Sequence, residues 1–211
     1  MATTSKELRR ELNRGDDPTI HVGPGIWDVR DCTISRPLTL VGQGRETVFR
    51  SSRANRRAFR FTGDGHLRVR GIQFNGYKRA IELLPVAEEV TIDDCSFVDC
   101  ATAVYGGTNE ARTIRCGRIQ LKNLHLRGMS GRAIDIHTPF DSCCVRDSVI
   151  DGAGQGAVWL GDSDIGIYLY RHATVRGCEI GNVHAAKDCK AVMIAANVGS
   201  ILSNHRSEER R

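Results

Sequence analysis

Short stretches in which apolar and polar residues alternate recur along the chain about every 23 to 30 residues. The clearest of them begin at Leu67, Val90, Ile119, Cys143 and Ala173. Each holds a first alternating segment, an apolar pair shortly after it, and a third short alternating segment, which in the last stretch follows an insertion. Because side chains of a β-strand point alternately to opposite faces, each stretch predicts three short strands that share an inward apolar face. The last inward residues of the first strands are Val69, Ile92, Leu121, Val145 and Val175.

Two corners of defined chemistry separate the predicted strands. The position between the first and second strands holds a residue type that tolerates a left-handed backbone. These positions are Gly71, Asp94, Asn123, Asp147 and Gly177. A second polar or glycine-containing corner follows the middle strand near residues 75–76, 99, 128, 151–152 and 181–182. Three strands and two corners per repeat predict a solenoid, whose stacked repeats bury a core that one repeat could not bury alone.

The two ends of the chain differ from the repeats. Thr4 and Glu7 have the spacing of a helix capping box, Leu8 and Leu12 share one helix face, and Gly15 can end the helix. We therefore expect residues 1–17 to form an N-terminal helix that caps the solenoid, residues 18–200 to form the solenoid, and residues 201–211 to be a flexible polar tail. The repeat pattern ends after Met193 without a comparable C-terminal cap, so we expect the last repeat to be covered by a partner or to end loosely.

Composition agrees with a strand-rich protein and narrows its setting. The 211 residues include 22 glycines and only 6% aromatic residues, which favours strands with turns over a helical bundle. Eight cysteines without paired C-x-x-C spacing predict reduced thiols, most of them in the core, and no zinc site. No apolar stretch reaches the ~18 residues of a membrane span, and no secretory signal begins the chain. We expect no membrane association and a cytoplasmic or virion location.

These repeats, together with the segments VGPGIW (22–27) and LTLVGQG (38–44), resemble the right-handed parallel β-helix proteins of the pectate-lyase-like superfamily. The resemblance covers roughly residues 18–200 and implies an all-β, right-handed parallel β-helix of about six rungs. The superfamily includes polysaccharide lyases, glycoside hydrolases, uronan epimerases, phage tailspikes and adhesins, so the fold does not decide the activity. The sequence lacks a clustered set of Asp residues like the calcium site of pectate lyases and lacks an Asp-Pro-His epimerase signature. We expect no metal and no cofactor.

The resemblance implies that a substrate would lie on the outer face of the third strand of each repeat. Alternation directs Ile81 and Leu83 inward and therefore Glu82 outward. The same rule places Arg60, Glu82, Tyr105, Asp135, Trp159 and Met193 in one outward row, with His137 on the face of Asp135. Long loops, roughly residues 107–118 and 162–172, flank the repeat of Asp135, and loops on a rigid scaffold often carry binding sites.

Three residues of this face are predicted to be catalytic. Glu82 and Asp135 lie two repeats apart, or about 9.6 Å at the spacing of parallel strands, near the upper end of the ~6.5–9.5 Å between the carboxylates of inverting glycosidases. His137 is the alternative general base for proton abstraction from a uronate. Tyr105 and Trp159 are predicted to stack on sugar rings, with Arg60 and Asp162 as further substrate-binding residues. An ordinary solvated sheet surface remains the alternative.

Three functions follow from this pattern. The first is polysaccharide binding, with degradation by a lyase or glycoside hydrolase mechanism if the face is catalytic. The second is a non-catalytic structural or adhesion module, such as a phage tail or virion component, which associates through its C-terminal end with a partner or as a homo-oligomer such as a trimer. The third is binding of nucleic acid or another polyanion by Arg70, Lys122, Arg146 and Arg176. We rank it last because the net charge of +5 is modest and the charges are interspersed.

Overall fold

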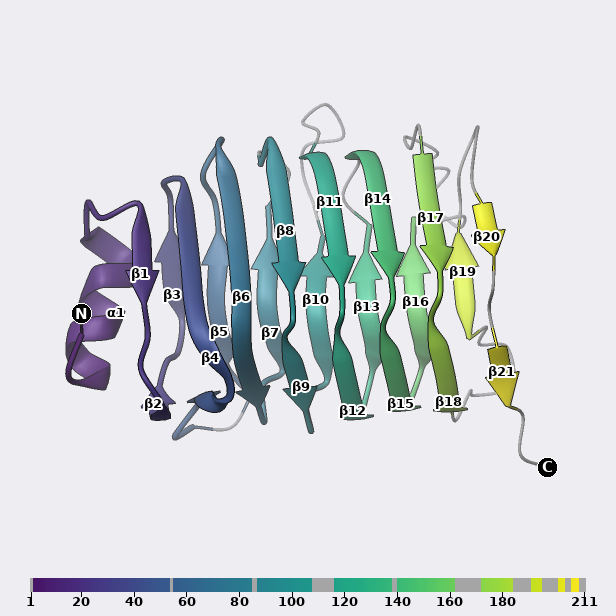
Figure 1. The fold of residues 1–211 in the computed structure, drawn as a ribbon, viewed down its shortest axis with the longest axis horizontal. Coiled ribbons are helices and arrows are strands. Elements are labelled where there is room, and N and C mark those ends of the chain that lie inside the picture. Colours follow the sequence, from purple (N-terminus) through teal and green to yellow (C-terminus); the bar gives the residue numbers. More distant parts are fainter. Residues whose placement is uncertain are drawn as a thin grey trace.

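The computed structural model describes residues 2–53, 55–84, 87–107, 116–137, 140–161, 172–183, 191–194, 201–203 and 206–208. Within them, the chain forms one short helix and mostly parallel strands in two sheets, as the predicted all-β class requires (Figure 1). The helix is α1 (Ser5–Arg14). The larger sheet holds β1 (Thr19–His21), β2 (Gly25–Asp28), β4 (Leu38–Arg50), β6 (His66–Asn75), β8 (Glu89–Asp93), β9 (Ser96–Val98), β11 (Cys116–Lys122), β12 (His125–Met129), β14 (Phe140–Arg146), β15 (Val149–Ala153), β17 (His172–Arg176), β18 (Glu179–Val183), β20 (Ile201–Ser203) and β21 (Arg206–Glu208). The smaller sheet holds β3 (Cys32–Ile34), β5 (Arg57–Phe61), β7 (Arg79–Leu83), β10 (Thr102–Gly106), β13 (Arg132–Ile136), β16 (Gly156–Leu160) and β19 (Val192–Ile194).

Strands of the same position in successive repeats pair in parallel and in register. In the smaller sheet, for example, Val104 on β10 pairs with Ile81 on β7 and with Ile134 on β13. Figure 1 shows the strands side by side along the long axis, from α1 in purple to β21 in yellow. This arrangement is compatible with a β-helix-like solenoid. In the described part of the chain, seven sets of first, second and third strands run from β1–β3 to β17–β19, where the pattern predicted about six. Strands β20 and β21 follow them within the segment expected to be a flexible tail.

The predicted corners have the expected backbone conformation. At the bend between first and second strands, φ is positive at Gly71, Asp94, Asn123, Asp147 and Gly177, with values between 51° and 65°. At the second corner it is positive at Gly76, Asp99, Gly128, Gly152 and Asn182. Glycine at position 71 is also needed for space, because a Cβ there would lie 2.9 Å from the carbonyl oxygen of Gly42. Local residue chemistry therefore sets where each repeat turns.

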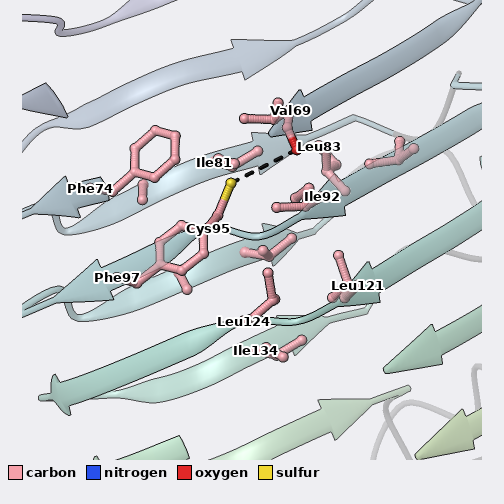
Figure 2. Close-up of a cluster of buried hydrophobic side chains, with 14 of the residues drawn as sticks. Val69, Phe74, Ile81, Leu83, Ile92, Cys95, Phe97, Leu121, Leu124 and Ile134 are labelled. Carbon is pink, nitrogen blue, oxygen red and sulfur yellow. Dashed lines mark hydrogen bonds between the residues drawn. The ribbon is translucent and has the colours of Figure 1, made fainter. Parts of the chain in front are cut away.

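The core fills the space between the two sheets, and all the inward residues predicted for the first strands are buried. Aromatic rings of successive repeats lie above one another in the core, where Phe74 stacks on Phe97 with ring centroids 5.0 Å apart. Figure 2 shows these rings beside aliphatic side chains from both sheets. Cys95, as predicted, is a buried core thiol, and its Sγ lies 3.8 Å from the carbonyl oxygen of Val69, which it faces as a donor. Burial raises the pKa of Cys95 to about 12, which keeps the thiol protonated.

The N-terminal helix covers the first repeat. Thr4 caps it, since its side-chain oxygen accepts a hydrogen bond from the backbone N–H of Glu7 at 3.2 Å. Leu8 and Leu12 are fully buried in the common core, and Arg9 forms an ion pair with Asp28 on β2 at 3.0 Å. The sequence pattern thus predicted this helix, its cap and its buried face correctly. Among the described residues, no helix has the length and apolar character needed to cross a membrane.

Candidate functional site

The residues of the outward row predicted for the third strands are aligned in the register of the smaller sheet, although Met193, the last of them, is buried with 8% exposure. Consecutive partners along β5, β7, β10, β13, β16 and β19 are Arg60, Glu82, Tyr105, Asp135, Trp159 and Met193. Asp162, the remaining predicted substrate-binding residue, lies outside the described residues, as do residues 108–115 and 163–171 of the two long loops. The described part of this face therefore consists of strand residues and includes no residue between 108 and 115 or between 162 and 171.

Glu82 does not lie open on this row. Its side chain is only 6% exposed, and three arginines surround its carboxylate. Arg57 forms a close ion pair with this carboxylate. Nε of Arg60 lies 3.0 Å from Oε2 of Glu82, and a guanidinium nitrogen of Arg79 lies 3.4 Å from Oε1. Burial by itself raises the pKa of Glu82, but hydrogen bonds and charge attraction from Arg60 and Arg57 outweigh it, so the pKa lies below its ordinary value. An enclosed, ionised carboxylate is poorly suited to the catalytic role predicted for Glu82.

Asp135 and His137 form a close pair at the end of β13. Nε2 of His137 lies 2.6 Å from Oδ1 of Asp135, and a guanidinium nitrogen of Arg132 lies 3.3 Å from the same oxygen. The two side chains are 14% and 19% exposed. A carboxylate at this distance orients the imidazole, as in other carboxylate–histidine pairs that move protons. Of the three residues predicted to be catalytic, the structure brings these two together and separates Glu82 from them by the strand of Tyr105.

The two predicted aromatic residues are half-buried, and each is covered by an arginine from the preceding part of the sheet. The guanidinium carbon of Arg79 lies 3.6 Å from the centroid of the Tyr105 ring, and that of Arg132 lies 3.8 Å from the centroid of the Trp159 ring. Both contacts are cation–π interactions. A sugar that stacks on these faces would therefore first have to displace an arginine.

Arg57, Arg79 and Arg132 belong to the candidate face and were not singled out from the sequence. Each begins a third strand, and the register pairs Arg57 with Arg79 across β5 and β7. A signal was available, because the chain repeats Arg-Ala followed by Phe or Ile in RAFRF, RAIEL and RAIDI, at 57–61, 79–83 and 132–136. Alternation within a strand identifies the residues that face outward but not the arginine that opens each strand.

A hollow of about 330 Å³ lies on this face, at the start of β7, β10 and β13. Its lining is mostly polar and includes three hydroxyl groups, an amide, three cations and one carboxylate. The residues are Lys78, Arg79, Ala101, Thr102, Tyr105, Ser130, Gly131, Arg132, Asp135 and Gln155. The hollow thus offers many hydrogen-bond donors, one aromatic side and a positive charge balance. Among the described residues, no three His, Cys, Asp or Glu side chains come together as a metal site.

The basic row proposed for nucleic acid lies on the larger sheet and is partly neutralised. Asp93 stands between Arg70 and Lys122 in the register, and Lys122 Nζ lies 3.3 Å from its carboxylate. Arg146 pairs with Asp147 at 2.6 Å. Two of the four cations are therefore engaged by neighbouring carboxylates, which weakens this row as a surface for a polyanion.

Comparisons with protein-family models, with curated proteins and with solved structures found no match for this chain. The class that the chain's own geometry defines is an all-β protein of stacked parallel strands, with a cation-lined hollow on the outer face of its smaller sheet.

Proposed function

We propose that the chain is a right-handed parallel β-helix of the pectate-lyase-like kind and that the outer face of its smaller sheet binds an anionic polysaccharide. The repeat resemblance supports the family assignment. The general preference of parallel strands for right-handed connections supports the handedness. The observation that carries the binding proposal is the polar hollow at the start of β7, β10 and β13.

The lining of this hollow suits a sugar with carboxylate groups. Thr102, Ser130 and Gln155 can exchange hydrogen bonds with hydroxyl groups, and Tyr105 offers one edge of an aromatic ring. Lys78, Arg79 and Arg132 outnumber the single carboxylate of Asp135, so the hollow attracts an anion. Because the face continues along the stacked strands, a chain of sugar units could follow it from repeat to repeat.

If the face is catalytic, the geometry favours a lyase over a two-carboxylate hydrolase. Hydrolysis by Glu82 and Asp135 would need both carboxyl groups to reach the sugar as acid and base, and the three arginines that enclose Glu82 oppose that. Abstraction of a proton from a uronate needs one positioned base, which the pair of Asp135 and His137 can supply. His137 would then accept the C5 proton, the C–H electrons would form the C4=C5 double bond as the C4–O glycosidic bond breaks, and the departing oxygen would take the proton back from His137, while Asp135 holds the imidazole in place.

A panel of acidic and neutral polysaccharides tests this proposal with matched variants. Arg132→Ala should weaken retention on an acidic polysaccharide, whereas Arg127→Ala, an exposed arginine on β12 of the other sheet, should not. His137→Ala should abolish release of unsaturated uronate products without abolishing binding, and His125→Ala, also exposed on β12, is its control. Absence of binding to every polysaccharide of the panel would overturn the proposal, and binding without products would leave a carbohydrate-binding module.

We propose self-association as a second candidate function, on one observation. In the described residues, β19, β20 and β21 pair with strands on one side only, whereas α1 covers the opposite end of the core. Unpaired strand edges are templates for pairing with another chain. Light scattering over a range of protein concentrations tests this candidate, and a monomer at every concentration would contradict it.

A further inference from the structure

A second hollow, of about 260 Å³, lies beside the first, toward the N-terminal end of the smaller sheet. Its lining residues are Asp31, Asn55, Arg56, Arg57, Lys78, Arg79 and Glu82. Lys78 and Arg79 also line the first hollow, so these two side chains form the wall between them. Aromatic side chains are absent from this lining, which makes it unsuited to stacking on a sugar ring.

The charge of the second hollow is strongly unbalanced. Four cationic side chains and two carboxylates line it, which leaves two positive charges in excess. Glu82 lies enclosed among its arginines, and Asp31 accepts ion pairs from Arg56 at 3.1 Å and from Arg57 at 3.6 Å. Lys78 is exposed, and its side chain has no ion pair within the described residues. Clustered cations of this kind repel one another, and an anion that binds among them relieves the repulsion.

The lining also supplies hydrogen-bond donors in the arrangement that oxyanions require. A guanidinium group has five N–H donors in a planar fork, and Arg56 is known to use only one nitrogen, toward Asp31. Lys78 adds an ammonium group with three donors, and Asn55 adds an amide. Glu82 acts as a positioning residue in this arrangement, because its contacts with Arg57 and Arg79 hold both guanidinium groups at the wall of the hollow.

We propose that the second hollow binds a phosphate monoester. A phosphate monoester carries close to two negative charges at neutral pH, which matches the excess in the hollow, and its oxygens accept the bidentate hydrogen bonds of arginine. A carboxylate, a sulfate ester or a nucleic-acid phosphodiester carries only one. The inference does not rest on polysaccharide binding at the first hollow, because its key residues Arg56 and Asn55 do not line that hollow.

Calorimetric titration of the full chain with inorganic phosphate at constant ionic strength tests the site. We expect saturable binding of one phosphate, and weaker binding of methyl sulfate, a sulfate ester with a single negative charge. Arg56→Ala and Lys78→Ala should each raise the dissociation constant for phosphate about tenfold, since each removes one charge-assisted contact. Arg10→Ala and Lys6→Ala, exposed cations on α1, should leave it within about twofold. Equal weakening by the α1 variants would show general charge attraction and overturn the site.

Two further arms separate the location of the site and the source of the phosphate. Arg132 lines only the first hollow, so Arg132→Ala should leave phosphate binding unchanged. Loss of phosphate binding in this variant would overturn the placement of the site in the second hollow. Glucose 6-phosphate should bind while glucose should not. A single-stranded oligonucleotide that binds more tightly than glucose 6-phosphate, with steep salt dependence, would contradict a phosphate monoester as the ligand. Arg56, Lys78, Arg10 and Lys6 are all exposed, so their substitution should not disturb the core. A thermal unfolding curve that matches the wild type verifies that each variant is folded.

Discussion

Replacement of Glu82 by Gln should lower the free energy of unfolding by about 2 kcal/mol at pH 7. The carboxylate is 6% exposed and accepts charge-assisted hydrogen bonds from Arg57 and Arg60. A hydrogen bond to a charged group contributes about 1.5–3 kcal/mol when its surroundings exclude water. Here the arginines are 32–39% exposed, so water screens part of each interaction and solvates them after the substitution. Gln has nearly the shape of Glu, so no cavity adds to the loss.

The stability difference should depend on pH in a defined direction. The pKa of Glu82 in the folded protein lies below its value in the unfolded chain, about 4.3. The ionised carboxylate therefore stabilises the fold fully above about pH 5, and this contribution is lost as the pH falls through the folded-state pKa. The difference between wild type and Glu82→Gln should be constant from pH 7 to about pH 5 and should shrink at lower pH.

Urea unfolding followed by circular dichroism at several pH values measures this difference. The control is Glu89→Gln, because Glu89 is 31% exposed and pairs at 3.2 Å with Arg68, which is 54% exposed. An exposed pair of this kind should contribute less than about 0.5 kcal/mol. The reasoning fails if Glu82→Gln is as stable as the control at pH 7, or if its deficit persists unchanged at a pH where Glu82 is protonated.

Two other substitutions probe the core and the bends. Phe74→Ala should destabilise the fold by about 3–5 kcal/mol in a urea titration, because the ring is fully buried among four other aromatic rings. Phe74→Leu should cost less, and an equal loss of stability would contradict the packing argument. Gly71→Ala should cost more than Gly44→Ala in the same assay. Both residues have positive φ, but only at Gly71 would the added Cβ meet a backbone oxygen, so equal losses would refute the role of close approach.

The bends show which parts of the fold can be predicted from residue types. Asp94, Asn123 and Asp147 were assigned to left-handed corners because their short polar side chains tolerate that backbone, and all three have φ near 52°. Alternation then predicted that Val69 and Ile92 face inward, and both are buried. These predictions succeeded because conformation at a corner and alternation along a strand depend on near neighbours in the chain.

The surroundings of the outward residues could not be predicted in the same way. Alternation predicted correctly that Glu82 and Tyr105 share one face, but the partners of both depend on arginines that other strands carry. Arg57 and Arg60 reach Glu82 across 25 and 22 positions of sequence, and Arg79 reaches Tyr105 across 26. Nothing in the alternation of one strand says which of several long cationic side chains will fold over a neighbouring carboxylate or ring.

The amino-acid sequence by itself therefore determined the repeat, the corners, the inward core and the order of the outward row, because all of these follow from local backbone preference and strand periodicity. Tertiary structure alone decided that Glu82 is enclosed, that Asp135 meets His137, and that two cation-lined hollows share Lys78 and Arg79. The reason is physical. A charged side chain takes the partner that stacking brings within reach, and stacking sets neighbours about 25 residues apart beside one another.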